Sequence, residues 1–170
     1  MGRSNVGKSS LINALTRQKI ARTSAAPGKT RLANYYLVQS LVPNPQSLYL
    51  VDLPGYGYAR GGLESAEEFE QLTRQYFDAS DPRRRLAGVL QLIDARHTEL
   101  PQDAAGFEWL MRTQLPLAIV ATKMDKLKRS DQSKTANALG KKYGVTVLPE
   151  SAMNGEGLDE IWKLLRQWSE

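Results

Sequence analysis

The residues most able to do chemistry stand near the start of the chain, in the run Gly2-Arg3-Ser4-Asn5-Val6-Gly7-Lys8-Ser9. Glycines, a lysine and a hydroxyl residue at this spacing are typical of a phosphate-binding loop. The glycines let successive backbone N–H groups turn inward, at the positive end of a helix that begins near Lys8. The Lys8 ammonium can then reach the phosphates, and the Ser9 hydroxyl can ligate Mg²⁺. The run therefore predicts a nucleotide site, which Ser10 extends into the helix.

A second element, Asp52-Leu53-Pro54-Gly55, directly follows an apolar run that reads as a strand. In open α/β sheets the carboxyl ends of the strands face the ligand crevice, so Asp52 is placed to help hold Mg²⁺. Gly55 lets the chain turn so that its N–H can approach a terminal phosphate. Asp52, Leu53, Pro54 and Gly55 therefore join the predicted nucleotide site.

A third element, Thr122-Lys123-Met124-Asp125, follows the expected strand over 117–122 and can read the base. A carboxylate there can accept two hydrogen bonds from guanine, whereas adenine offers neither donor in that arrangement. The stem of Lys123 can lie against the base. Ser151-Ala152 follows the next strand, where its backbone can reach the guanine carbonyl. The elements in this order predict a GTP-binding domain.

These motifs are positioned by a chain that alternates apolar runs with helix-period segments. The alternation predicts a three-layer α/β fold, a mostly parallel sheet with helices on both faces. The last helix carries an apolar face at helical spacing, from Leu158 to Trp168, which we expect in the core. We expect strands over 32–39, 48–52, 87–94, 117–122 and 145–149, helices over 8–16, 64–77, 102–112, 132–143 and 158–168, and loops over 18–29, 43–46, 54–62 and 126–131.

Composition narrows the class of protein. The length of 170 residues suits one domain, and 41% hydrophobic with 24% charged residues is typical of globular chains. The absence of cysteine excludes disulfides and thiol catalysis, and His97 is the only histidine, which argues against a zinc site. Without a membrane span or signal peptide, we expect a cytoplasmic monomer. Residues 1–51 carry seven Lys or Arg and no acid, which indicates an anionic partner.

The ordered motifs resemble the translation-factor-like GTPases, and most closely the EngB family within the TrmE-Era-EngA-EngB-septin-like GTPases. The most specific stretch is Asp52-Leu53-Pro54-Gly55-Tyr56-Gly57-Tyr58-Ala59. The match also includes Pro27-Gly28-Lys29-Thr30, Asp94-Ala95-Arg96-His97, and Thr122 in place of the commoner asparagine. The resemblance implies GTP/GDP and Mg²⁺ as ligands, a switch loop containing Gly28 and Lys29, and a Thr30 that joins Ser9 and Asp52 at the metal.

The resemblance also implies a slow GTPase that switches during assembly of the large ribosomal subunit, acting on its rRNA or assembly intermediates. RNA phosphates could be contacted by three basic segments of the chain. These are the basic first third, Arg83-Arg84-Arg85, and the cluster Lys123, Lys126, Lys128 and Arg129. One alternative is a GTP-dependent binding module in cell division and septation without significant turnover. Another is a P-loop ATPase or kinase, against which Thr122–Asp125 argues.

For hydrolysis, we expect Lys8, Thr30 and Gly55 to stabilise the charge on the terminal phosphoryl group. Tyr56 stands where a water-orienting glutamine would follow Gly55, which predicts slow turnover and an external activator. Asn5 is a candidate ligand for K⁺ by resemblance, with a loop-stabilising role as the alternative. Arg60 is a weaker candidate for a charge-stabilising arginine, and His97 is expected to be structural.

One departure from the family pattern concerns the start of the chain. Only Met1 precedes Gly2, whereas family members carry an apolar strand there that lies in the middle of the sheet. We therefore expect residues 1–170 to form a single EngB-type domain truncated at its N-terminus. Two neighbouring strands would then lack a partner between them.

Overall fold

The computed structural model describes residues 1–22, 33–39, 47–56, 71, 73–77 and 86–170. Within these residues the chain forms an α/β fold, as predicted. The strands are β1 (Asn34–Gln39), β2 (Ser47–Asp52), β3 (Val89–Asp94), β4 (Leu117–Thr122) and β5 (Val147–Pro149). The helices are α1 (Lys8–Thr16), α3 (Pro101–Met111), the 3-10 turn η1 (Met124–Lys126), α4 (Arg129–Tyr143) and α5 (Leu158–Ser169).

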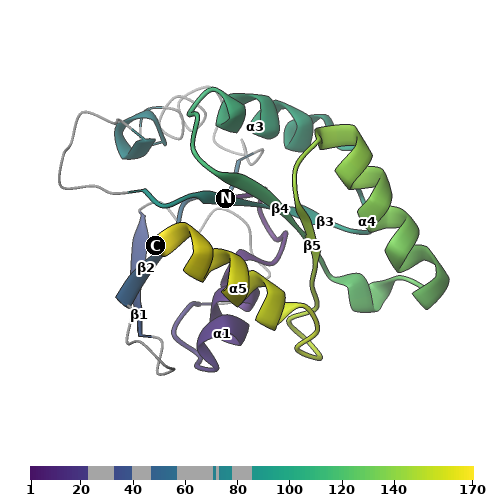
Figure 1. Cartoon of the computed structure of the whole chain (residues 1–170), viewed down its shortest axis with the longest axis horizontal. Coiled ribbons are helices and arrows are strands. Elements are labelled where there is room, and N and C mark those ends of the chain that lie inside the picture. The colour runs from purple at the N-terminus through teal and green to yellow at the C-terminus, as the bar shows by residue number, and fades with distance from the viewer. Residues whose placement is uncertain (23–32, 40–46, 57–70, 72, 78–85) are drawn as a thin grey trace.

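A parallel sheet in the order β3-β4-β5 forms the centre of the molecule. Figure 1 shows α3 and α4 on one face of this sheet and α1 and α5 on the other. Side chains alternate between the faces, because successive residues of a strand point in opposite directions. Ile93 packs toward α3 and α4, whereas its neighbour Leu92 packs toward α1 and α5. The core is thus divided into two layers, as expected for a covered parallel sheet.

β1 and β2 form a separate antiparallel pair, from Asn34 opposite Asp52 to Gln39 opposite Ser47. In the part of the chain described, no ladder joins β2 to β3 directly. The first residues of the chain lie beside β3: the Met1 ammonium donates to the Leu90 oxygen at 2.6 Å, and the Leu92 N–H donates to the Met1 oxygen at 2.8 Å. Burial lowers the pKa of this terminal ammonium to about 5.

Helix α5 confirms the predicted apolar face. Ile161 is fully buried, and the Trp162 indole N–H donates to the Leu15 oxygen of α1 at 3.3 Å. The ring of Trp168 lies so close to Gly88 that a Cβ there would come within 2.4 Å of it. These aromatic side chains therefore pack helix against sheet and neighbouring helix.

Some predicted boundaries were wrong. The loop expected over 126–131 is shorter, because α4 begins at Arg129, where the Gln132 amide donates to the Met124 oxygen at 2.9 Å. β3 and β5 begin two residues later than predicted, since their starts follow the register of the neighbouring strand. β1 begins at Asn34, and its predicted start at residue 32 lies outside the described residues. Of the helix expected over 64–77, residues 71 and 73–77 are helical and the others lie outside the described residues. No described helix is long and apolar enough to cross a membrane.

Candidate nucleotide-binding site

The phosphate-binding loop leads into α1 as its sequence predicts. Gly7 precedes the helix with φ 119°, in the left-handed region that favours glycine. Lys8 Nζ donates to the oxygens of Gly2 and Arg3, each at 3.1 Å, so the ammonium lies across the loop. Burial lowers the pKa of Lys8, and the nearby Asp52 carboxylate opposes this shift. The first turn of α1 holds no acid, so its N–H groups and positive end are left for an anion.

Asp52 ends β2 beside this loop and is 4% exposed. Burial raises its pKa, while Lys8, the terminal ammonium and a hydrogen bond from Ser9 lower it. Oδ1 of Asp52 is buried and has no hydrogen-bond partner. A carboxylate oxygen without a partner beside a serine hydroxyl suits Mg²⁺, which takes one or two protein oxygens together with phosphate oxygens. In the described part of the chain no group of three or more His, Cys, Asp or Glu side chains could hold a metal by itself.

Gly55 lies directly over the phosphate-binding loop. A Cβ at this position would come 2.8 Å from the Ser4 nitrogen and 2.9 Å from Lys8 Nζ. Any larger residue would have to move the chain away from the loop. Leu53 is buried beneath this turn, and Pro54 is half-buried. Residue 55 therefore lies against the loop, and its approach to a terminal phosphate stays a prediction.

The base-reading element is bonded to the phosphate-binding loop. The Thr122 hydroxyl donates to the Val6 oxygen at 2.7 Å, and Lys123 Nζ donates to the Asn5 oxygen at 2.7 Å. Lys123 itself has φ 61°, which turns the chain sharply at the end of β4. The predicted phosphate and base elements thus form one connected unit.

Asp125 is held in place for hydrogen bonding. The Ser151 hydroxyl donates to its Oδ1 at 2.8 Å, and Lys126 Nζ lies 3.2 Å from its Oδ2. Burial would raise the pKa of Asp125, but the bonds from Ser151 and Lys126 outweigh it and lower this pKa. The group is therefore an ionised acceptor at neutral pH. Met124 is buried behind it, and its N–H donates to the Glu150 oxygen at 3.1 Å.

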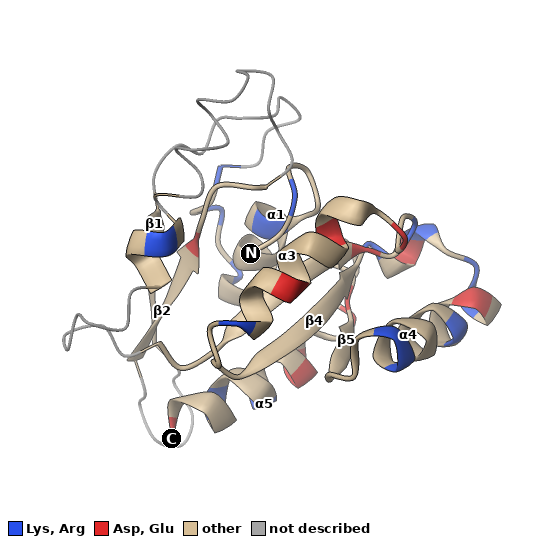
Figure 2. Ribbon diagram, turned by 90° about the horizontal axis from the view of Figure 1, so that it is seen from above, with Lys and Arg blue, Asp and Glu red and all other residues tan. Residues whose placement is uncertain are grey.

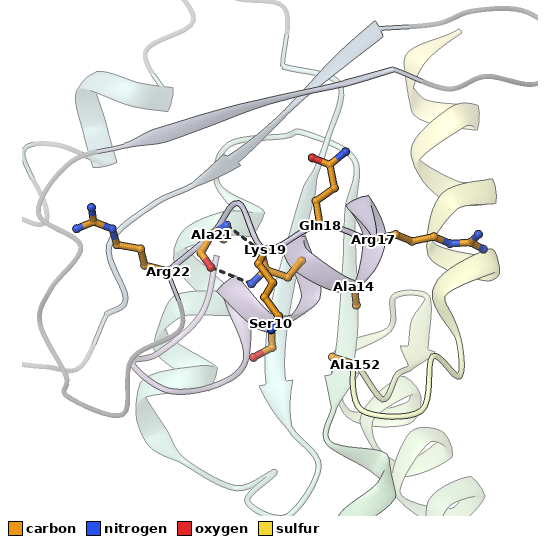
Figure 3. A pocket seen from close by; sticks show the side chains of 9 residues that line it. Ser10, Ala14, Arg17, Gln18, Lys19, Ala21, Arg22 and Ala152 are labelled. Atoms are coloured by element: carbon orange, nitrogen blue, oxygen red, sulfur yellow. Dashed lines mark hydrogen bonds between the residues drawn. The ribbon is translucent and has the colours of Figure 1, made fainter.

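A cavity of about 600 Å³ opens beside α1 (Figure 3). Its wall includes Ser10, next to Ser9, and Ala152, next to the serine whose hydroxyl donates to Asp125. The cavity therefore borders the predicted site at Ser10 and Ala152, whereas Lys8, Asp52 and Asp125 do not line it. Its volume suits a small-molecule ligand. The Asn13 amide exchanges two 2.8 Å hydrogen bonds with the Ala21 backbone and closes one side. The sequence did not predict the remaining wall, Ala14, Arg17, Gln18, Lys19 and Arg22.

Asp94, which the sequence singled out only as part of a family motif, is the centre of an ionic cluster beside the loop. Asp94 is fully buried at the end of β3 and accepts from Arg96 Nε at 2.9 Å and Nη2 at 2.7 Å. Lys123 Nζ donates to it at 2.9 Å, and Arg3 Nη2 lies 3.6 Å away. Burial opposes ionisation, but these cations hold the pKa of Asp94 far below its usual value. One carboxylate thus joins the phosphate-binding loop to the base-reading element.

The structure brings together the predicted residues of the loop, of Asp52–Gly55, of Thr122–Asp125 and of Ser151-Ala152. His97 donates its backbone N–H to the Asp94 oxygen at 2.8 Å, as a turn residue would. Other predicted residues lie outside the described part of the chain: Gly28, Lys29, Thr30, Tyr58, Arg60 and Arg83–Arg85.

Comparison with known proteins agrees with this geometry. Residues 1–123 match the family model described as 50S ribosome-binding GTPase. The chain is 42% identical over 167 residues to the probable GTP-binding protein EngB of Thermosipho africanus, covering 97% of this chain and 82% of that protein. The chain belongs to the EngB family of GTP-binding proteins, which are GTPases. The EngB protein of Limosilactobacillus reuteri is 41% identical over 175 residues, covering 100% of this chain and 83% of its own length.

The fold of this EngB-family chain is that of P-loop GTPase domains. It superposes with a TM-score of 0.81 on the crystal structure of Era in complex with MgGDPNP and nucleotides 1506–1542 of 16S ribosomal RNA. The match covers 99% of this chain and 55% of that one, at 24% identity, so it bears on the fold alone.

Proposed function

We propose that this chain binds GTP and GDP with Mg²⁺, hydrolyses GTP slowly, and acts as a nucleotide switch in assembly of the large ribosomal subunit. The observation that carries the nucleotide assignment is the pair of hydrogen bonds from Thr122 to Val6 and from Lys123 to Asn5. They fix the position of Asp125, the carboxylate proposed to bind guanine, relative to the phosphate-binding loop. Guanine is preferred because adenine would leave that ionised acceptor unpaired.

In this proposal the loop N–H groups and Lys8 bind the phosphates, and the base lies against Asp125 and Ser151-Ala152. Ser9 and Asp52 would hold Mg²⁺, with Thr30 as a further ligand, and the metal would neutralise charge on the phosphates. Gly55 donates its N–H toward the terminal phosphate. Preorganised donors of this kind supply most of the catalysis in phosphoryl transfer.

Turnover is proposed to be slow because Tyr56, which stands where a water-orienting glutamine would follow Gly55, does not take over the role of orienting the water. The residue is only 9% exposed, and its hydroxyl forms hydrogen bonds with Gln91 and Asp103 in the interior. The hydroxyl is therefore directed away from solvent. An activator would supply the missing function. Asn5 is proposed to bind K⁺ in that role. GTPase rates at equal concentrations of KCl and NaCl test this, and equal rates would exclude it.

Binding of guanine nucleotides is tested by displacing fluorescent GDP with GTP, GDP and ATP. We expect the guanine nucleotides alone to compete. Asp125→Asn puts an amide donor against the donors of guanine and should lower the affinity for GDP about 100-fold or more. Asp131→Asn in the first turn of α4 is the matched control and should bind as the wild type does. Competition by ATP at similar concentration would contradict the proposal.

The ribosomal role is supported by the family model's description and by the charge of α4. Figure 2 shows Lys and Arg along this helix. The exposed cations on this helix and just before it outnumber the one acid of its first turn. They are Lys126, Lys128, Arg129, Lys134, Lys141 and Lys142, of which Lys142 is paired with Glu99. Such a surface suits contacts to RNA phosphates, which depend on charge and shape rather than on base sequence.

Co-sedimentation with large ribosomal subunits tests this role. We expect binding that requires GTP, weakens with salt, and falls when Lys134 and Lys141 are both changed to Gln. Lys163→Gln with Arg166→Gln on α5 removes the same charge from a helix whose first turn carries two acids, and serves as the control. Equal loss in both double variants, or binding without GTP, would contradict it.

A further inference from the structure

Tyr56 directly follows Gly55 at the phosphate-binding loop, yet its side chain lies in the interior between β3 and α3. Its hydroxyl donates to Asp103 Oδ1 at 3.0 Å and accepts from Gln91 Nε2 at 2.9 Å. Gln91 Nε2 also donates to the Asp103 backbone oxygen at 2.8 Å. Gln91 and Asp103 are wholly buried. The phenol therefore stands at the centre of a buried polar group built by β3 and α3.

The same polar group reaches the phosphate-binding loop. Arg3 Nε lies 3.8 Å from Asp103 Oδ2, and the Arg3 backbone forms a parallel bridge with Tyr56. Arg3 Nε and Asp103 Oδ2 are both buried and have no hydrogen-bond partner, so the two atoms interact as an ion pair, while Arg3 Nη2 lies 3.6 Å from Asp94. Asp103 thus meets Tyr56 through one carboxylate oxygen and the loop through the other.

Helix α3 also confines the ring. A Cβ at Gly106 would lie 3.0 Å from Tyr56 Cζ and 3.1 Å from Cε1, so a larger residue would push the ring out of place. Glycine is unfavourable inside a helix, and here the close approach of the ring accounts for it. The ring therefore contacts α3 over its face as well as through its hydroxyl.

We propose that Tyr56 is a positioning residue for GTP hydrolysis, whose buried hydrogen bonds to Asp103 and Gln91 hold Gly55 against the phosphate-binding loop. The inference rests on the proposed GTPase function. Gly55 is one peptide bond from this anchor, and its approach to the Ser4 nitrogen leaves no room for a Cβ. The anchor keeps Gly55 in place by contacts within the protein. Helix α3 would then follow any movement of Tyr56 that accompanies loss of the terminal phosphate.

The test is Tyr56→Phe, which keeps the ring and its contact with Gly106 but removes both hydroxyl bonds. Only GTP carries the phosphate that Gly55 approaches. We expect kcat and the affinity for a non-hydrolysable GTP analogue each to fall about tenfold, as for one lost hydrogen bond to a charged group. The affinity for GDP should stay within about twofold of the wild type, since GDP does not use this contact.

Tyr143→Phe is the matched control. Its hydroxyl is also buried but bonds to neither Asp103 nor Gln91, and its ring packs on Phe107 at 4.5 Å. Asp103→Asn is a second test, useful if Tyr56→Phe does not fold. Its amide keeps the shape and can still accept the Tyr56 bond, but it loses the charge that faces Arg3. We expect the affinity for the GTP analogue to fall preferentially here too, but by a smaller factor.

Loss of kcat and of GTP-analogue affinity in Tyr56→Phe or Asp103→Asn, with GDP affinity retained and Tyr143→Phe unaffected, would support the inference. Equal weakening of both nucleotides, the behaviour of a merely structural bond, would overturn it, and so would no change at all. A wild-type chain that hydrolyses no GTP would overturn the proposed function and this inference with it. Wild-type turnover with unaffected variants overturns the inference alone.

Discussion

The hydroxyl of Thr122, at the end of β4, donates a hydrogen bond of 2.7 Å to the backbone oxygen of Val6 in the phosphate-binding loop. The two residues stand 116 positions apart, and both are almost wholly buried. A buried carbonyl that loses its donor keeps the full cost of its desolvation. The bond therefore links the stability of the loop to the position of the base-reading element.

Thr122→Val keeps the side-chain volume but removes this donor. We expect the free energy of unfolding to fall by about 1–3 kcal/mol and the affinity for GDP to fall with it. Denaturant unfolding and GDP titration measure the two effects. Thr113→Val is the control, since its hydroxyl donates to the Leu110 oxygen at 2.7 Å after α3, away from the site. It should lose stability without losing GDP affinity, and an unchanged GDP affinity in Thr122→Val would contradict the prediction.

Gly55→Ala should separate hydrolysis from binding. The added methyl group would come within 3.0 Å of the Ser4 nitrogen and Lys8 Nζ, so residue 55 must move off the loop. We expect kcat to fall about 100-fold, the size typical of a lost backbone donor in the transition state. Single-turnover GTP hydrolysis measures this. Gly140→Ala in α4, where a Cβ meets only the Val147 methyl group at 3.9 Å, should hydrolyse GTP normally. Normal turnover in Gly55→Ala would refute the proposed role.

Glu150 should make stability depend on pH. Burial, helped by the Asp125 charge, raises its pKa from 4.5 to about 7, and the side chain is 2% exposed. The folded state then holds this proton more tightly than the unfolded state does. The contribution of Glu150 to the free energy of unfolding is therefore complete below pH 4.5 and is lost as the pH rises through about 7.

Glu150→Gln removes this titration. At pH 8 we expect the variant to be more stable than the wild type by about 2–3 kcal/mol, and at pH 5 the two should be nearly equal. Unfolding free energies across this range measure the difference. Glu156→Gln, at an exposed position, should follow the wild-type curve. Parallel curves for wild type and Glu150→Gln would show that the carboxyl titrates normally.

Local patterns in the sequence predicted the elements with sharp boundaries. Helix α1 runs over Lys8–Thr16 as predicted, because the loop glycines fix its start and Arg17 turns left-handed at its end. Strand β4 runs over Leu117–Thr122 as predicted, because an apolar run ends at a polar motif. The start of α4 was not predicted, because it depends on the Gln132 bond to the preceding turn.

The polar contacts between distant residues could not be predicted. Asp103 is 47 positions from Tyr56, and its helix α3 has only a weak amphipathic pattern in sequence. Asp94 was noted by resemblance, but its bond to Lys123 spans 29 positions. Such pairs exist only once the helices have packed on the sheet. The chemistry-bearing motifs are local and visible in the sequence, whereas the bonds that hold them are not.

The indole N–H of Trp162 contacts the last turn of α1 through the Leu15 oxygen. The first turn of that nine-residue helix carries Lys8 and Ser9. A helix this short moves as one body, so a shift at its phosphate end alters the surroundings of the indole. Trp109 packs on Phe77 and Trp168 on Gly88, away from α1. We therefore expect the intrinsic fluorescence of Trp162 to report nucleotide occupancy, and replacing the other two tryptophans would isolate its signal.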